Sequence, residues 1–178
     1  MIIRSWLFVP GDSERKLEKA KTNPSDALIL DLEDSVSDDR QELARAMVRE
    51  YLLEREDRKR QQLWVRINPL DTELSLPDLA AVMPGAPDGI CLPKVYSAKD
   101  VNKLANFLSA LEAREGLEIG STKICFSGVP KATTTSLWTY RPRVWKPRSI
   151  VTQLKWLIKA SFVLRILANT LSLLSSGS

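Results

Sequence analysis

The stretch ALILDLEDS, residues 27–35, decides the fold, because four apolar residues run without interruption and then meet a group of acidic ones. A strand that is apolar on both faces is typical of a parallel sheet covered by helices. Similar short runs, each ended by Pro, Gly or charged residues, recur through the first 124 residues. We predict strands at 6–9, 27–30, 63–68, 89–92 and 123–124.

Amphipathic helices are predicted between these strands. Asp12 or Ser13 is expected to cap a helix over 14–20, and Ser97 to Asp100 resembles a capping box. Two apolar helix faces follow from spacing: Leu43, Met47, Val48, Leu52 and Leu53 in one, and Val101, Leu104, Leu108 and Leu111 in the other. The alternation of strands and helices predicts an α/β fold.

Polar and charged residues stand at the ends of the predicted strands: Asp31, Glu33 and Asp34 just after the second, Arg66 and Asn68 within the third, and Lys94 just after the fourth. Alternation alone does not separate an open sheet from a barrel. No GxGxxG or GxxxxGK[ST] follows a strand, which argues against dinucleotide or P-loop phosphate binding. In a (β/α)8 barrel the carboxyl ends of the strands carry the active site, so this pattern favours a barrel.

Arg66 is the leading candidate for a functional residue. It lies between Val65 and Ile67, so its side chain is predicted to point to the opposite face, toward a barrel lumen. There it is expected either to pair with Asp31 or Glu33, or to clamp a substrate carboxylate or thioester carbonyl. The two interpretations are compatible.

The acidic group after the second strand has its own alternatives. Asp31 and Glu33 share a face of an extended segment, where they are candidates to bind Mg²⁺ or to hold Arg66. Asp34 is as readily explained as a solvated cap of the next helix. The turn at Gly11 has amides that could face a phosphate, but many turns share this pattern.

Composition excludes several classes of chemistry. The chain has no histidine, which rules out Ser-His or Cys-His catalysis and histidine-bound metals. Cys91 and Cys125 are its two cysteines and form no CxxC motif, so a disulfide framework or zinc knuckle is not predicted. The early charges after residue 9 do not fit a signal peptide. We expect a cytoplasmic protein.

Charge divides the chain at Cys125. All 22 acidic residues precede it, and 18 of the 26 Lys and Arg do too, so residues 1–124 carry −4 and residues 125–178 carry +8. The acid-free stretch contains an aromatic and basic segment at 138–148 and a possible basic helix at 150–174. Lysines and an arginine interrupt that helix, which disfavours a membrane span. We expect neither a membrane nor a nucleic-acid partner.

Four motifs carry a resemblance to a known family: RSWLFVPG at 4–11, LILDLEDSV at 28–36, VRIN at 65–68 and LPKV at 92–95. In this order and spacing they resemble the citrate lyase β-subunit/HpcH–HpaI aldolase superfamily, in particular its bacterial CoA-ester lyases. The resemblance covers residues 3 to about 124. It implies the first four to five βα units of a TIM (β/α)8 barrel, in oligomeric enzymes that use Mg²⁺ in carbon–carbon lyase reactions on CoA or carrier thioesters of hydroxy acids.

The resemblance also implies roles for single residues. Arg66 matches the arginine that holds the acid portion of the substrate and stabilises enolate charge, with Asp31 and Glu33 as supporting catalytic residues. Arg4 and Gly11 match a region near the entry for the CoA or carrier group. We expect Lys94 to be a further substrate-binding residue.

The chain departs from the family pattern where metal ligands are next required. The family's magnesium-binding glutamate falls near Gly128, and no acidic residue is left for the sixth-strand aspartate. We therefore expect no complete Mg²⁺ site and little or no turnover. Because the barrel is incomplete, we also expect its first and fifth strands to be unpaired edges.

We interpret residues 125–178 as out-of-frame or divergent sequence. The alternative is a non-enzymatic binding module whose basic tail contacts a membrane or nucleic acid.

Overall fold

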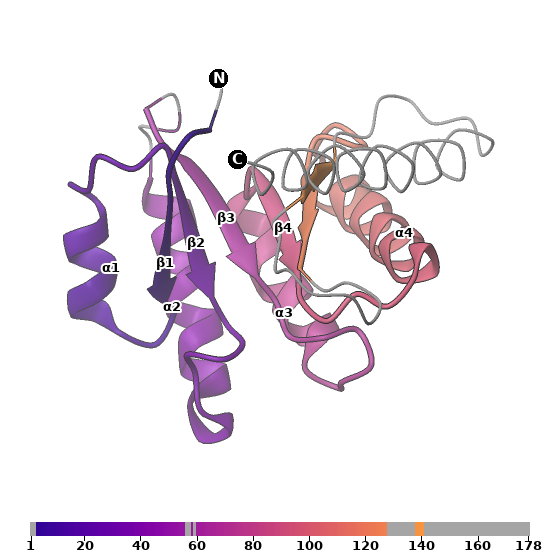
Figure 1. Cartoon of the computed structure of the whole chain (residues 1–178), viewed down its shortest axis with the longest axis horizontal. Helices are drawn as coiled ribbons and strands as arrows, with labels where there is room; N and C mark the ends of the chain where they lie inside the picture. The colour runs from indigo at the N-terminus through magenta and orange to yellow at the C-terminus, as the bar shows by residue number, and fades with distance from the viewer. Residues whose placement is uncertain (1–2, 56–57, 59, 128–137, 141–178) are drawn as a thin grey trace, which may run out of the picture. The chain divides into compact units, whose positions relative to one another are not determined.

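The computed structural model describes residues 3–55, 58, 60–127 and 138–140. Within them, strands alternate with helices along the chain (Figure 1). The strands are β1 (Trp6–Pro10), β2 (Ala27–Asp31), β3 (Gln62–Arg66), β4 (Gly89–Leu92), β5 (Lys123–Phe126) and β6 (Trp138–Tyr140). The helices are α1 (Glu14–Ala20), α2 (Gln41–Glu54), α3 (Ser75–Val82) and α4 (Ala98–Glu115), with 3₁₀ turns η1 (Asp38–Arg40) and η2 (Met83–Gly85).

The strands form a six-stranded sheet in the order of the sequence, β1 to β6. The first five are parallel, and β6 runs antiparallel to β5. Right-handed crossovers that always step in the same direction place every helix on the same face of a sheet. Sequential order therefore separates this fold from a doubly wound sheet, whose order reverses at a switch point, and agrees with the predicted barrel type.

The two faces of the sheet are packed differently. On one face, strand residues such as Leu28, Leu63 and Val65 join residues from α1, α2, α3 and α4 in the main apolar core. On the other face, a smaller cluster of Ala27, Ile29, Trp64, Cys91 and Cys125 consists of strand residues alone. Side chains alternate between faces along a strand, so Arg66 belongs to the face of Trp64, which corresponds to the lumen of a barrel.

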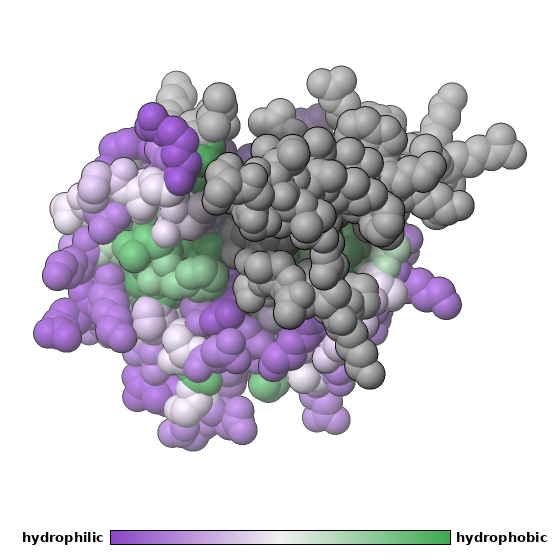
Figure 2. Space-filling view, viewed as in Figure 1, coloured by the Kyte–Doolittle hydropathy of each residue, from purple (hydrophilic) through white to green (hydrophobic). Residues whose placement is uncertain are grey.

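The lumen face carries aromatic residues near its β1 edge. Trp6 contacts Trp64 edge to face, with ring centroids 5.1 Å apart, and Phe8 remains 45% exposed. Figure 2 shows an apolar area over β1 and β2 on the viewed side, bordered by hydrophilic residues.

Most predicted elements are present, and the capping box is confirmed. At the start of α4 the Ser97 side chain accepts the backbone N–H of Asp100, and the Asp100 carboxylate accepts the backbone N–H of Ser97 at 2.8 Å. Val101, Leu104 and Leu108 are buried. The predicted apolar face of α2 is wrong in part. Leu43 and Leu53 are exposed, and the buried face is made by Ala44, Val48, Tyr51 and Leu52.

Three further features differ from the sequence prediction. Helix α3 was not predicted, and neither was β6, which pairs with β5 so that β5 is not an unpaired edge. Strand β5 runs through Phe126, so the sheet includes the first residues of the acid-free stretch. The expected segments at 141–148 and 150–174 lie outside the described residues.

Candidate functional site

The candidate site lies at the carboxyl ends of the parallel strands. Strand register places Pro10 beside Asp31, Asp31 beside Arg66, and Arg66 beside Cys91. Neighbouring strands are about 4.8 Å apart, so side chains in one row on one face are in contact. The predicted meeting of Arg66 with the acidic group of β2 follows directly from this row.

Arg66 is held by Asp31 in a bidentate pair. Its Nε and Nη2 donate to the two carboxylate oxygens of Asp31, each at 2.7 Å. Its third nitrogen, Nη1, lies 3.2 Å from Oε2 of Glu33 and 3.3 Å from Oδ2 of Asp34. The guanidinium carbon is 4.9 Å from the centroid of the Phe8 ring, a cation–π contact. One edge of the guanidinium is therefore fixed, and the other is less tightly bound.

The acidic loop after β2 is shaped by Asp31 itself. Its carboxylate accepts the backbone N–H of Glu33 at 3.0 Å and of Ser35 at 3.2 Å, which turns the chain. Burial pushes the pKa of Asp31 upward, but the hydrogen bonds from Arg66, Ser35 and Glu33 outweigh it and the pKa is lowered. Asp31 is therefore ionised when it holds Arg66.

Arg66 is affected in the opposite sense. Burial lowers its pKa, but the neighbouring carboxylates of Asp31, Glu33 and Asp34 outweigh burial and raise it. The guanidinium side chain is 17% exposed, so a permanent positive charge stands close to the surface of the site.

Glu33 links Arg66 to Lys94. Its side chain is only 5% exposed, and Oε1 lies 3.1 Å from Nζ of Lys94. Neither carboxylate oxygen of Glu33 accepts a hydrogen bond of regular geometry from the part of the chain that the structure describes. The pairing with Glu33 raises the pKa of Lys94. Lys94 has a left-handed backbone, with φ of +50°, which is strained for a residue with a Cβ.

Behind the site, a buried polar network holds the ends of β2 and β3. Asp78, fully buried, accepts from Nε of Arg45 at 2.7 Å and from the backbone N–H of Asn68 at 2.8 Å. The Asn68 amide donates to the Leu32 carbonyl at 2.9 Å. This network fixes the backbone directly before Glu33. Asn68 was predicted from its place in the third strand, whereas Asp78 was not predicted because it lies in the unpredicted helix.

Gly11 and Arg4 have other surroundings than the cluster. Gly11 donates its N–H to the Asp31 carbonyl at 2.9 Å, and a Cβ there would stand 2.8 Å from that oxygen. Only glycine permits this close approach of β1 and β2. Arg4 precedes β1 and pairs with Asp26 at 3.6 Å, with its side chain 82% exposed. Arg4 lies at the amino end of the parallel strands, whereas Arg66 lies at their carboxyl end, so the structure does not bring Arg4 to the cluster.

The described residues do not fit a magnesium site. Both oxygens of Asp31 are engaged by Arg66, and those of Glu33 face Arg66 and Lys94. In the ranges that the structure describes, no group of three acidic, cysteine or histidine side chains is placed to hold a metal. Gly128, the predicted position of the family's glutamate, lies outside those ranges.

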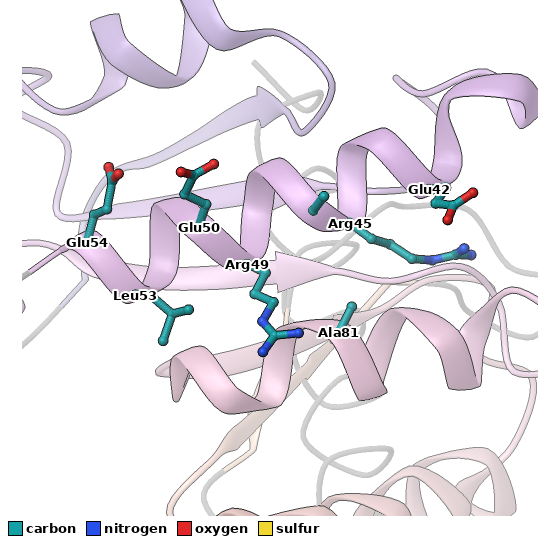
Figure 3. A pocket seen from close by; sticks show the side chains of 8 residues that line it. Glu42, Arg45, Arg49, Glu50, Leu53, Glu54 and Ala81 are labelled. Carbon is teal, nitrogen blue, oxygen red and sulfur yellow. The ribbon is translucent and has the colours of Figure 1, made fainter.

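A separate hollow lies on the helical side, between α2 and α3. Figure 3 shows Arg45 and Arg49 of α2 beside it, with Ala81 on the facing helix. It is lined by Glu42, Arg45, Ala46, Arg49, Glu50, Leu53, Glu54 and Ala81. None of the predicted site residues lines it, so it is distinct from the Arg66 cluster.

Among the residues that the structure describes, every helix is too short or too polar to span a membrane.

Comparisons with known proteins agree with the resemblance. The chain is 44% identical over 105 residues to a (3S)-malyl-CoA thioesterase of Cereibacter sphaeroides, covering 59% of this chain and 36% of that protein. It is 40% identical over 119 residues to the citrate lyase subunit beta of Escherichia coli K12, covering 67% and 39%. The chain thus spans well under half the length of these curated relatives.

Solved structures support the fold. A Haloferax volcanii malate synthase, in a complex with pyruvate and acetyl-CoA, matches 70% of this chain and 39% of its own with a TM-score of 0.64 at 18% identity. The α/β architecture is thereby confirmed as part of a TIM-barrel-like fold. The sequence pattern of the HpcH/HpaI aldolase/citrate lyase family matches residues 4–127. The chain therefore belongs to the HpcH/HpaI aldolase/citrate lyase family.

Proposed function

We propose that residues 4–127 bind the acid portion of a hydroxyacyl thioester, carried on CoA or on a carrier protein, at Arg66. The observation that carries this proposal is the asymmetric hold on the guanidinium. Asp31 takes Nε and Nη2 with two 2.7 Å bonds, whereas Nη1 has only longer contacts to Glu33 and Asp34. Nη1 is thus the nitrogen that a substrate carboxylate can take over.

Lys94 completes this binding site. Its ammonium stands on the other side of Glu33 from Arg66 and its side chain is 56% exposed, so two cations flank one buried carboxylate. An anionic ligand would contact both Nη1 of Arg66 and the ammonium of Lys94. It would replace their contacts with Glu33 and Asp34. The three carboxylates outnumber the two cations, and a bound anion would add to this excess. Tight binding of a dianion therefore requires an additional cation.

In the family to which this chain belongs, Mg²⁺ would supply such a cation and polarise the thioester substrate in carbon–carbon cleavage. The described residues offer no magnesium site, and residues 125–178 contain no carboxylate to add. We therefore propose binding without efficient turnover for this chain, and lyase activity for family members that keep the metal ligands.

Two measurements on the purified chain test the proposal. Malate or malyl-CoA is titrated by NMR or calorimetry, and malyl-, citramalyl- and citryl-thioesters are assayed with Mg²⁺. Arg66→Lys is expected to weaken binding by about ten- to a hundredfold, because a lost charge-assisted hydrogen bond is worth roughly 1.5–3 kcal/mol. Arg114→Lys, on the exposed end of α4, is the matched control and should bind as the parent chain does.

The two parts of the proposal fail separately. Equal affinity for the parent chain and Arg66→Lys would remove Arg66 from the binding site. Turnover at the rate of a full-length relative would overturn the inference that the metal site is lacking, whatever the binding result.

A further inference from the structure

The cysteines of the chain are brought together by the fold. Cys91 in β4 and Cys125 in β5 are register partners on neighbouring parallel strands, although 34 residues separate them in the sequence. Their Sγ atoms are 2.8 Å apart, both as free thiols. Both side chains lie in the strand-only cluster on the lumen face, and the two residues are 5% and 1% exposed.

This placement meets the distance requirement of a disulfide. A disulfide usually joins Cα atoms that are roughly 4.4–6.8 Å apart, and neighbouring strands lie about 4.8 Å apart. The sulfur atoms already point at each other. A metal site is a poorer explanation of the pair, since no third cysteine, histidine or acidic ligand joins them among the residues with assigned positions.

We propose that Cys91 and Cys125 form an intramolecular redox pair, which a peroxide converts to a disulfide that links β4 to β5. The sulfur of Cys91, the more exposed of the two, attacks hydrogen peroxide. The O–O bond breaks, one water leaves and a sulfenic acid forms. The sulfur of Cys125 then attacks the sulfenic sulfur, the S–O bond breaks and a second water leaves. Two thiols are oxidised and one peroxide is reduced to two waters.

Burial of the two sulfurs and the nearby charge of Arg66 affect how this reaction depends on pH and on the size of the oxidant. Burial raises the pKa of the Cys91 thiol well above its ordinary value, while the charge of Arg66 acts in the opposite direction. Raising the pH should therefore speed the oxidation, and the burial of both sulfurs should exclude bulky oxidants from direct attack. Since Arg66 is the register partner of Cys91, the disulfide would form in the same row as the Arg66–Asp31 pair.

Mass spectrometry gives the direct test. The folded chain is treated with hydrogen peroxide, unfolded in denaturant and alkylated with iodoacetamide. We expect a mass lower by two hydrogens, no alkylation, and a peptide map in which the peptides of Cys91 and Cys125 are joined, all reversed by dithiothreitol. Cys91→Ser and Cys125→Ser should each leave a single sulfenic acid or alkylatable thiol. Two alkylated thiols, or disulfides between separate chains, would overturn the proposal.

A second measurement separates a preorganised pair from a chance encounter. The fraction of disulfide is measured at equilibrium in glutathione redox buffers, for the native chain and for the chain in urea. Because the fold holds the two sulfurs together, the native chain is expected to have an effective thiol concentration at least about tenfold higher. An equal or lower value in the native chain would show that the fold does not favour the bond.

Discussion

Arg66 is a charged residue within an otherwise apolar strand, and the neighbouring carboxylates explain how the fold tolerates it. Asp31 supplies two short charge-assisted bonds and Phe8 covers one face of the guanidinium. Replacing one member of such a pair leaves the other charged and poorly solvated, so residue-level changes here should affect stability as well as binding.

The stability that Asp31 provides should depend on pH. Its folded pKa lies below the ordinary value of 3.8, so folding favours the ionised form. That contribution is fully present above about pH 5 and is lost as pH falls through the lowered pKa. In urea unfolding, the gap between the parent chain and Asp31→Asn should therefore be widest at pH 6 and should narrow toward pH 3. Asp39→Asn, on the surface, should show a much smaller gap, and a gap independent of pH would contradict this account.

Lys94 allows backbone strain to be separated from its ion pair. Lys94→Gly and Lys94→Ala both remove the contact with Glu33, but only glycine adopts a φ of +50° without strain. Lys94→Gly should be more stable than Lys94→Ala by about 1 kcal/mol, measured by urea unfolding. If the alanine variant proved as stable as the glycine variant, strain at this position would be negligible.

Some of the site could be predicted from sequence and some could not. Arg66, Asp31 and Glu33 were recognisable because charged residues at the ends of apolar strands must meet at one edge of a parallel sheet. The contact of Phe8 and the pairing of Cys91 with Cys125 depend on strand register, which spacing alone does not give. The remoteness of Arg4 from the cluster likewise becomes visible only when the direction of β1 is known.

At the scale of elements, the strands were more predictable than the helices. Continuous apolar runs marked β2 and β4, but α3 has only eight residues, contains Pro77 and lies after the turn at Pro69. For α2, the leucines suggested an apolar face that includes Leu43 and Leu53, whereas the buried residues Ala44, Val48, Tyr51 and Leu52 follow the i, i+4, i+7, i+8 spacing of a single helix face. The pattern was present in the sequence, but Ala44 and Tyr51 are less conspicuous as core residues than leucines.

Packing between β3 and β4 requires a glycine. A Cβ at Gly89 would stand 2.3 Å from the Trp64 ring, which is fully buried. Gly89→Ala should destabilise the chain by roughly 1–3 kcal/mol, the range seen for overpacked cores, and should alter tryptophan fluorescence. Gly120→Ala is the comparison, since it adds a Cβ with nothing within 4 Å; the strain of its positive φ should cost about 1 kcal/mol, but tryptophan fluorescence should not change. A silent Gly89→Ala substitution would mean that Trp64 can move aside.

The network at Asp78 makes a second prediction for the elements. Asp78→Ala leaves Arg45 and the Asn68 amide without their buried acceptor, so a loss of about 3–5 kcal/mol is expected. Thermal unfolding measures this loss. Asp71→Ala, in the nearby exposed turn, should change stability little. Comparable effects of both substitutions would contradict a special role for the network.

At the scale of the whole molecule, the change of charge at Cys125 and the family match at 4–127 nearly coincide. We propose that the barrel-type part and the basic remainder have separate origins, with a shift of reading frame as the cause. The gene downstream of codon 124 should then encode, in another frame, a Thr-Glu-Thr-like and a Gly-x-x-Asp-like segment. Sequencing this region tests the prediction, and a downstream region without these segments in any frame would favour a genuine divergent tail.

The sequential strand order also has a consequence for biosynthesis. From β1 to β5 each strand pairs with the one made just before it, so every contact between neighbouring parallel strands is closed by one helical segment and its loops. Nothing in β1 to β4 has to wait for a distant partner. The chain can therefore assemble unit by unit as it leaves the ribosome, and the Arg66–Asp31 pair of β2 and β3 does not require β4 or β5 for its formation.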